Sequence, residues 1–346
     1  MPIVEYHPGL FEKLQRMVSQ LKSNMNLSHR PFVDYYYASR DWCKLYLYLS
    51  DSGEVVGTLG RELLRFEYQG REFTIRIGSN WFSLRPGIGG QLTRFSAQSN
   101  PGTFGMMLMA SQTAVSVLRH LDWVPIPGLT AYFLNGPCSL FPGKSRWKPA
   151  ANWLVRQILG KPIPSFAARI PADVRARISV SEEHSYSPDL LPRRSPFPFR
   201  FAPPIEYLDW RYNLALSFVR YRLFRILASG TTVGYVILNE SPAHLIVAQC
   251  DGEQAAALAY GVLLAILAVA AGDQHPRSVF LSCCHGEMRR IFEEFGFRPR
   301  PRRPEIPFAF RDVPPQIERP LDSSRWLVNY DWCDNGLQAP FLDQQA

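Results

Sequence analysis

The chain has 346 residues, of which 46% are hydrophobic and 20% charged. It can therefore bury a large core and is long enough for two domains, which excludes a disordered or fibrous protein. Lysine and arginine outnumber the acids 38 to 30, a formal net charge of +8. This excess could serve nucleic acid, an anionic membrane surface or a phosphate-bearing ligand. The densest arginines lie beside prolines at 298–304 with no aromatic ladder between them, so we expect a solvated basic surface and no nucleic-acid partner.

The apolar spacing predicts, in chain order, an amphipathic helix at 10–24, strands at 44–49, 54–68 and 72–84, a helix at 91–98, a strand at 104–109, a helix at 111–121 and one or two strands at 124–133. A proline-rich basic stretch with one helix at 150–159 follows and indicates an interdomain connection at 137–204. The second half predicts strands at 221–228, 233–239 and 244–249, a long helix at 255–271, a strand at 278–283, a helix at 287–295 and a strand at 306–311.

The long apolar segment 255–271 is close to the shortest length that spans a bilayer. It is rich in alanine, is interrupted by Gly261, and is flanked by the acids Glu253 and Asp273 instead of basic anchors. We therefore predict a helix buried against a sheet and no membrane span.

The cysteines and the N-terminus bear on location. Six scattered cysteines show no disulfide framework, and the first nine residues lack the regions of a signal peptide. Both observations predict a cytoplasmic protein with reduced thiols. Cys283, Cys284 and His285 are adjacent on a predicted strand, but no second pair lies at zinc-ligand spacing, so no metal site is predicted.

The chain contains an internal repeat. Residues 52–57 (SGEVVG) return as 229–234 (SGTTVG), and each copy continues through similar elements to a closing pair, Asp122-Trp123 or Gly296-Phe297. A repeat of this kind indicates two modules of one architecture. We expect domain limits at 1–136 and 205–346, with the connection between them.

Only the first copy carries a glycine loop, Arg85 to Gly90 (RPGIGG), between a strand and a helix. Glycines in that position let backbone N–H groups approach a phosphate, the helix N-terminus adds partial positive charge, and Arg85 adds a full charge. The loop has neither the Gly-Lys-Ser/Thr of a Walker loop nor a dinucleotide fingerprint. A plain turn would use the same glycines, and this alternative stays open.

The order of hairpin, strand, glycine loop, helix, strand, helix and closing strand resembles the GNAT superfamily of acyl-CoA N-acyltransferases. The resemblance covers both modules and implies an α/β fold of two GNAT-like modules, each a mixed, mostly antiparallel sheet flanked by helices. The chain is similar to double-GNAT proteins that modify bacterial polysaccharides or secondary metabolites, and partly to FemAB-type transferases. The segment 325–332 resembles the closing strand of such tandem proteins.

By this resemblance the loop would hold the pyrophosphate of acetyl-CoA or another acyl-CoA as co-substrate. Its positions here are Leu84, Arg85, Gly87, Ile88, Gly89 and Gly90. The acceptor would be an amine on a small molecule or a polysaccharide precursor. The oligomeric state stays open.

The chain departs from the family pattern at several positions. Leu84 stands where the family has Arg or Gln, and Leu118 and Phe292 stand where many members place the tyrosine that protonates the departing thiolate. The candidate catalytic residues are Asn80, which would orient a water, and Tyr132, which would replace the missing acid. The alternative is that both residues have only structural roles. The predicted function is acyl-CoA-dependent N-acyl transfer; the alternative is a catalytically silent binding or scaffold protein.

Overall fold

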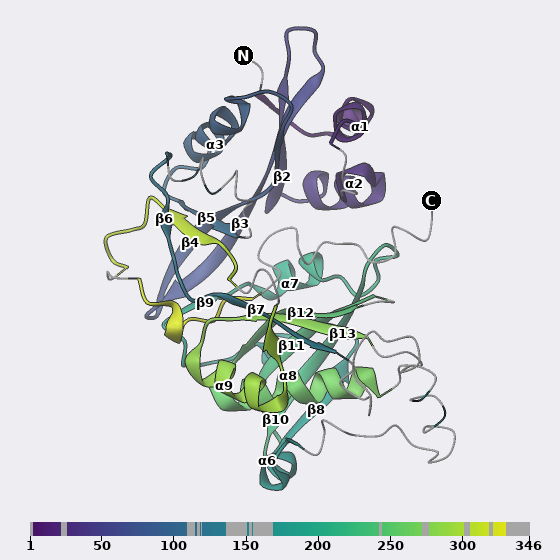
Figure 1. Cartoon of the computed structure of the whole chain (residues 1–346), viewed down its shortest axis with the longest axis vertical. Coiled ribbons are helices and arrows are strands. Elements are labelled where there is room, and N and C mark those ends of the chain that lie inside the picture. Colours follow the sequence, from purple (N-terminus) through teal and green to yellow (C-terminus); the bar gives the residue numbers. More distant parts are fainter. Residues whose placement is uncertain are drawn as a thin grey trace.

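The structure is a computed structural model that describes residues 3–21, 26–108, 120–135, 169–241, 244–271, 277–300, 305–317 and 321–329, together with residues 115, 118, 151 and 154. Within these residues the chain forms two mixed sheets, one above the other in Figure 1. The predicted α/β fold of two similar modules is confirmed. The predicted helix at 150–159, most of the helix at 111–121 and the end of the segment 325–332 lie outside the described residues.

The first sheet has the order β1-β2-β3-β4-β5-β15-β6, and β9 pairs with β3. Its strands are β1 (Ile3–Glu5), β2 (Cys43–Leu49), β3 (Val55–Tyr68), β4 (Arg71–Ser83), β5 (Phe104–Leu108), β6 (Val124–Pro125), β9 (Phe199–Phe201) and β15 (Phe308–Arg311). Helices α1 (Phe11–Val18) and α2 (Arg30–Ala38) cover one face, and α3 (Ile88–Gln98) covers the other. Among the described strands, β4 and β5 form the one parallel pair of this sheet.

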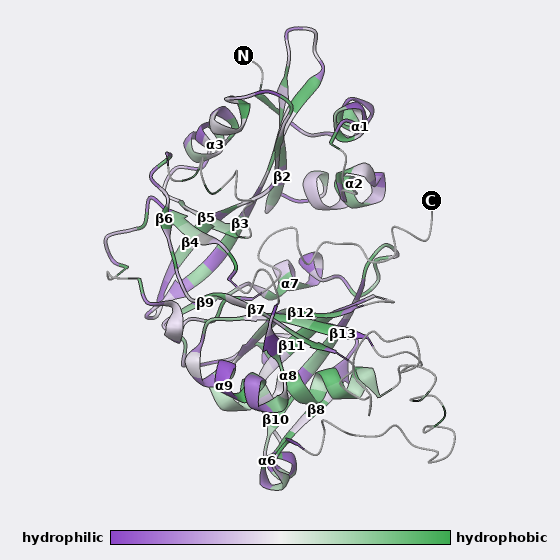
Figure 2. Ribbon diagram, in the orientation of Figure 1, coloured by the Kyte–Doolittle hydropathy of each residue, from purple (hydrophilic) through white to green (hydrophobic). Residues whose placement is uncertain are grey.

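The second sheet has the order β14-β7-β13-β12-β11-β10-β8. Its strands are β7 (Thr130–Asn135), β8 (Ile178–Glu183), β10 (Arg220–Ala228), β11 (Thr231–Glu240), β12 (His244–Gly252), β13 (Ser278–Cys283) and β14 (Arg298–Pro299). Helices α8 (Ala255–Ala270) and α9 (Gly286–Phe295) pack against it, α6 (Ala172–Arg177) precedes β8, and α7 (Ile205–Arg211) precedes β10. The helix α8 is hydrophobic along its length and mostly buried, as predicted (Figure 2).

The two modules exchange one strand. In the first sheet β15, from the C-terminal half, lies between β5 and β6; in the second sheet β7, from the N-terminal half, lies between β13 and β14. The connection 137–204 also contributes β8 to the second sheet and β9 to the first. The sheets therefore cross the limits predicted at 136 and 204. Strand pairing at long sequence distance leaves no mark in local periodicity, which is why the pattern did not show it.

One large hydrophobic cluster lies between the two sheets and includes side chains of both modules, and a second surrounds α8 and α9. Phe199, Phe310 and Trp326 pack there, with ring centroids of Phe199 and Trp326 4.5 Å apart. The buried pair of Arg211 on α7 and Glu62 on β3, 3.1 Å apart, adds a polar link between the halves. The modules thus share part of their hydrophobic cores.

The local elements follow the sequence pattern with two kinds of difference. The opening helix is shorter than predicted, because Pro8–Leu10 forms a 3-10 turn and α1 ends at Val18. The pattern missed β1, β8, β9, β14, α2, α6 and α7. The helix α2 contains three consecutive tyrosines after Pro31 and Val33, residue types that carry little helical signal, and packing of its aromatic face decides its structure.

Candidate functional site

The glycine loop ends β4 and begins α3. Gly87 is the N-terminal cap of the helix and has a φ of 82°, which favours glycine over any other residue. No side chain caps this end, and the first turn contains no acid. The first N–H groups of α3 are therefore available to an anion, and Arg85 lies exposed beside them.

The other loop residues anchor this geometry. Ile88 is buried against β3, where a Cβ on Gly57 would lie 2.5 Å from the Ile88 side chain. The Leu84 N–H donates to the carbonyl of Val56 at 2.9 Å, which ties the start of the loop to the same strand. The helix end is thus held tightly to the sheet.

Gly89 has a different role from the one the sequence predicts. A Cβ there would lie 2.8 Å from Nε1 of Trp81, and this indole nitrogen donates to the Gly89 carbonyl at 3.1 Å. A side chain at Gly89 would displace Trp81 before it reached any anion. At both Gly87 and Gly90 a Cβ would meet no atom within 4 Å, and of these two only Gly90 has a backbone conformation that accepts a side chain without strain.

Asn80 lies in a β-bulge of β4. The register between β3 and β4 shifts between Thr58 and Gly60, and Asn80 has a φ of 46°. The side-chain amide nitrogen of Asn80 donates to the Tyr37 hydroxyl at 2.5 Å, and its backbone carbonyl accepts from the Thr58 hydroxyl at 2.8 Å. Asn80 is buried and its side chain is used to hold the bulge, a device that often re-aims backbone next to binding sites.

The strands β4 and β5 separate just before this bulge. Their pairing ends at Ile77 and Met106, although β4 continues to Ser83. The edge of β4 from Gly78 onward therefore has no ladder partner on the β5 side among the described strands, and it leads directly to the glycine loop. An extended ligand with amide groups could pair with such an edge while its phosphate lay at α3.

In the second module two parallel strands also separate, but another segment of the chain fills the gap between them. Pairing of β12 with β13 ends at Ile246 and Phe280, and β12 is also irregular at Ala248. Residues 326–329 lie in the gap that follows. The Asn329 amide donates to Gln249 at 2.9 Å and to the carbonyl of Cys250 at 3.1 Å, and it accepts from the Cys250 thiol at 3.1 Å.

The same segment contacts β13 and the residue after it, since the Ser282 hydroxyl donates to the Val328 carbonyl at 3.4 Å and the Cys284 thiol donates to the Trp326 carbonyl at 3.2 Å. The segment 326–329 thus fills the gap beside β12, which corresponds to the open space beside the edge of β4 in the first module. The corresponding cleft is closed by the chain itself.

The acids at the end of β12 are also engaged. Asp251 is buried, contacts the Arg200 guanidinium, and accepts from the Gly252 N–H at 2.8 Å. Burial raises the pKa of Asp251 to about 7, although Arg200 opposes the shift. Glu253 accepts from the N–H of Arg193 at 2.9 Å. Neither acid caps α8, which begins at Ala255 without a side-chain cap.

Tyr132 lies away from the loop, on β7 of the second sheet. It is fully buried, donates to Glu293 at 2.6 Å and accepts from Arg289 Nε at 2.9 Å. Burial, together with the bond to Glu293, raises the pKa of Tyr132 to about 12. The structure therefore does not bring Tyr132 together with Asn80. It brings together Asn80 and the residues 84–90 at one end of β4.

Three side chains that hold the site together were not predicted from the sequence. Tyr37 holds Asn80, Trp81 holds Gly89, and Met107 packs against β4 at Gly78. Trp81 stands directly before the loop, and this aromatic position was the available signal. The other two come from elements whose contacts with β4 no local pattern specifies.

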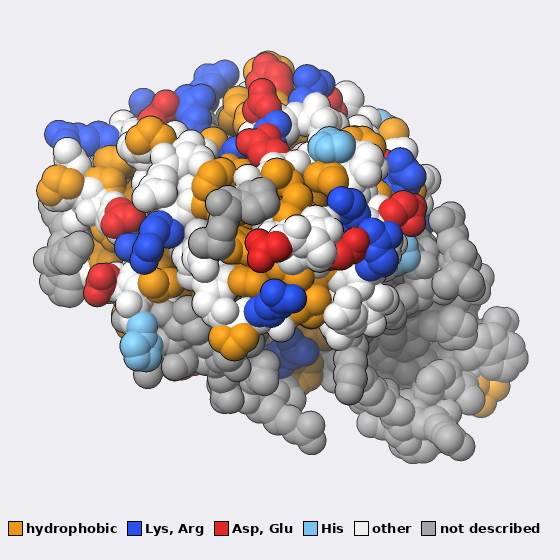
Figure 3. Space-filling view, turned by 90° about the horizontal axis from the view of Figure 1, so that it is seen from above, with side chains coloured by type: hydrophobic (Ala, Val, Ile, Leu, Met, Phe, Trp, Pro, Cys, Tyr) orange, Lys and Arg blue, Asp and Glu red, His pale blue; other side chains and the backbone are white. Residues whose placement is uncertain are grey.

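The charges do not form one field on the face shown in Figure 3, where basic and acidic side chains alternate over the surface. Many are paired: Arg222 with Glu182, Arg225 with Glu183 and Asp189, for example. Among the described helices none has both the length and the apolar character needed to cross a bilayer.

No protein-family model and no curated protein matches the chain. Solved structures do share its fold. The chain is similar to a tandem GNAT protein from the clavulanic acid biosynthesis pathway, at 13% identity over 90% of this chain and 98% of that one, with a TM-score of 0.50. It is also similar to Saccharomyces cerevisiae N-myristoyltransferase with bound myristoyl-CoA, at 9% identity over 94% and 89%, with a TM-score of 0.56.

A third similar structure is an N-acetyltransferase from Anabaena variabilis, at 11% identity over 90% of this chain and 72% of that one, with a TM-score of 0.52. Identities this low show the fold alone. The chain has the tandem GNAT fold, with the exchanged strands described above.

Proposed function

We propose that the chain is an acyl-CoA-dependent N-acyltransferase that moves an acetyl or other acyl group to an amine on an amino sugar, a metabolite or a peptide. The observation that carries the proposal is the uncapped N-terminus of α3 at the end of an edge of β4 that pairs with no described strand on the β5 side. The fold supports it, since similar folds include a structure that holds myristoyl-CoA and proteins named as N-acetyltransferases.

The binding role of each part follows from its chemistry. The pyrophosphate of CoA would accept from the first N–H groups of α3 near Gly90, and Arg85 would add charge. The amide-containing arm would run along β4 from Ser83 towards Gly78 and pair with the edge that no described strand covers on the β5 side. The thioester would then lie near the bulge at Asn80.

The reaction needs few catalytic groups. The substrate ammonium first loses a proton to solvent, and the neutral amine nitrogen then attacks the thioester carbonyl. The C–N bond forms, the C–S bond breaks, the nitrogen loses its second proton, and the departing thiolate takes up a proton to give the free thiol of CoA. Correct placement of amine and carbonyl can contribute about 7 to 11 kcal/mol. Asn80 would act as a positioning residue, because it holds the bulge of β4. Tyr132 would have no role as an acid, because it lies on the other sheet.

A catalytically silent acyl-CoA-binding protein is the second candidate. It is favoured by the surroundings of Leu118, which packs with Met107 and Trp123 and offers no proton. Both candidates require that acyl-CoA binds at the loop. They differ in whether thiol is released.

The experiment has two steps. Calorimetry of the purified chain with acetyl-CoA, longer acyl-CoAs and free CoA tests binding, and no binding to any of them would overturn both candidates. Thiol release is then followed with a panel of amines, amino sugars and peptides. A rate that depends on the amine and rises with pH as the ammonium deprotonates supports transfer. Binding without release favours the silent protein.

A further inference from the structure

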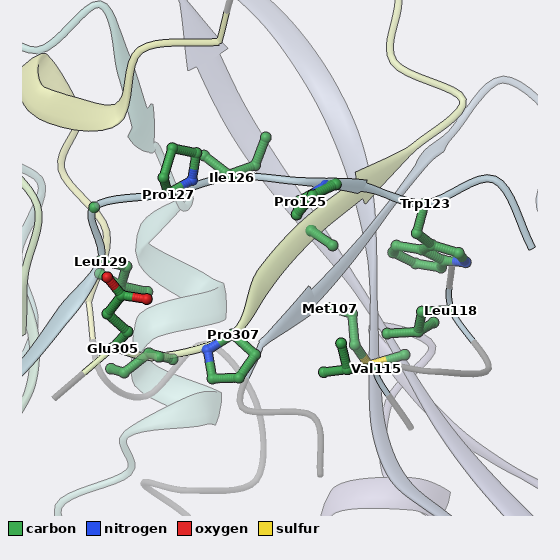
Figure 4. Close-up of a pocket in the computed structure, with 13 residues that line it drawn as sticks. Met107, Val115, Leu118, Trp123, Pro125, Ile126, Pro127, Leu129, Glu305 and Pro307 are labelled. Atoms are coloured by element: carbon green, nitrogen blue, oxygen red, sulfur yellow. The ribbon is translucent and has the colours of Figure 1, made fainter. Parts of the chain in front are cut away.

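A cavity of about 530 Å³ lies where the exchanged strands cross between the modules (Figure 4). Residues 126–129 lead from β6 to β7, and residues 305–307 lead back to β15. These two segments run side by side, because Ile306 N–H donates to the carbonyl of Leu129 at 2.9 Å and Thr130 pairs with Glu305. They form one wall of the cavity, which therefore exists because of the strand exchange.

The opposite wall belongs to the first module and consists of Met107, Val115, Leu118 and Trp123. The lining is almost wholly hydrocarbon. Glu305 is the single charged residue among the described residues that line it, is exposed, and lies on the far side from Met107 and Trp123 in Figure 4. The buried indole nitrogen of Trp123 has no hydrogen-bond partner in the described part of the chain.

The cavity adjoins the proposed acyl-CoA site. A Cβ on Gly78 would lie 2.9 Å from Cε of Met107, so the Met107 side chain rests on β4 just where pairing with β5 has ended. Trp81 packs against the cluster of Met107, Leu118 and Trp123, and its indole nitrogen also donates to Gly89. Continuous packing therefore joins the glycine loop to the cavity wall.

We propose that this cavity takes the acyl chain of the co-substrate and that the chain is several carbons longer than acetyl. The inference rests on the proposed function and names its acyl group. At about 30 Å³ for each water-sized group, the cavity holds on the order of a dozen such groups, far more than an acetyl needs. A saturated chain would replace water on hydrocarbon walls.

The lining argues against the acceptor as occupant. Hydroxyl groups of a sugar would lose their hydrogen bonds to water and find almost no partners on these walls, which costs binding free energy. Met107 lines the cavity and contacts β4 at Gly78, at the end of the edge along which the arm would run. An acyl chain that continues from the thioester would therefore reach the cavity wall at Met107.

The test compares acetyl-CoA with butanoyl-CoA and octanoyl-CoA by calorimetry. Burial of each methylene should lower Kd by about 4-fold until the cavity is filled, so octanoyl-CoA should bind at least about 100-fold more tightly than acetyl-CoA. Val115→Phe fills the cavity from the first module. It should weaken octanoyl-CoA binding by about 10-fold or more and leave acetyl-CoA within about 2-fold.

Two further variants sharpen the test. Ala309→Leu fills the cavity from β15 and should shift the chain-length preference in the same direction, which protects against misfolding of either variant alone. Val124→Phe is the matched control, because Val124 is 39% exposed on β6 and does not line the cavity. It should change neither affinity.

The outcomes separate the two proposals. Failure of every acyl-CoA to bind would overturn the proposed function and this inference with it. Equal affinity of acetyl-CoA and octanoyl-CoA in the wild type would overturn the inference alone. Val115→Phe and Ala309→Leu variants that keep octanoyl-CoA affinity but lose the use of an amine would assign the cavity to the acceptor instead.

Discussion

The Trp81 indole donates to the carbonyl of Gly89 at 3.1 Å, and this bond joins the bulged strand β4 to the first turn of α3. The indole fills the space that a side chain at Gly89 would need. Gly89 is thus required by the packing of the loop, whereas Gly87 is required by its backbone conformation and Gly90 faces open space. Each glycine of the loop can therefore be tested by a different substitution.

Gly90→Glu should abolish acyl-CoA binding and leave the fold intact. The carboxylate would occupy the space and the positive end of α3 that a pyrophosphate would use, and it would complement the helix dipole itself. We expect a loss of affinity of at least about 100-fold, or about 2.7 kcal/mol. Calorimetry on a variant with an unchanged circular dichroism spectrum measures it.

Two variants control for charge and size. Gln98→Glu adds the same charge at the exposed far end of α3 and should leave affinity almost unchanged. Gly90→Ala should stabilise the helix by up to about 1 kcal/mol. If Gly90→Glu and Gln98→Glu bind acyl-CoA equally well, the glycine loop is only a turn.

At Asn80 the structure separates backbone conformation from side-chain chemistry. Asn80→Gly and Asn80→Leu both remove the bond to Tyr37, but only glycine tolerates the φ of 46°. Asn80→Leu should therefore cost about 1–2 kcal/mol more in the free energy of unfolding than Asn80→Gly. Denaturant titrations of the two variants measure this difference.

Acyl transfer by the same pair tests the role of Asn80. If Asn80 acts by holding the bulge, Asn80→Gly should keep most acyl-CoA affinity and Asn80→Leu should lose it. Equal and large losses of kcat with unchanged affinity in both variants would show that the amide itself acts on the reacting groups.

The local elements that form the candidate site can be predicted from the sequence better than the strands that come from the other half of the chain. The strand, the loop from Leu84 to Gly90 and the helix after it follow from local periodicity and glycine placement, and the repeat shows that a second module exists. The positions of β7 and β15 do not follow, since each pairs with strands more than a hundred residues away along the chain. The placement of Tyr132 near the loop fails for the same reason, because β7 belongs to the other sheet.

Tyr132→Phe should act on stability and leave acyl transfer unchanged. The variant leaves Glu293 and Arg289 without their bonds to the hydroxyl, which should cost about 1–3 kcal/mol in the free energy of unfolding. Thermal unfolding measures the loss. A fall in the rate of thiol release at unchanged stability would restore Tyr132 as an acid.

The same residue predicts a dependence on alkaline pH. Since the folded pKa of Tyr132 is raised to about 12 from its ordinary value of 10, the folded state holds the phenolic proton more tightly than the unfolded state. Its contribution is fully present below pH 10 and is lost between pH 10 and 12, by about 2–3 kcal/mol. Stability of wild type minus that of Tyr132→Phe should fall across this range; a constant difference would contradict the assignment.

The last prediction is that each chain binds one acyl-CoA, in the first module. In the second module Asn329 already holds Gln249 and Cys250 beside the gap between β12 and β13, so a ligand arm would have to displace the segment 326–329. Calorimetry should give one site for the wild type and none for Gly90→Glu, since that variant removes the first site alone. Asn329→Ala should lower stability by about 1–3 kcal/mol without creating a second site. Two sites in the wild type, of which one survives in Gly90→Glu, would show that the second module binds acyl-CoA despite the segment that fills it.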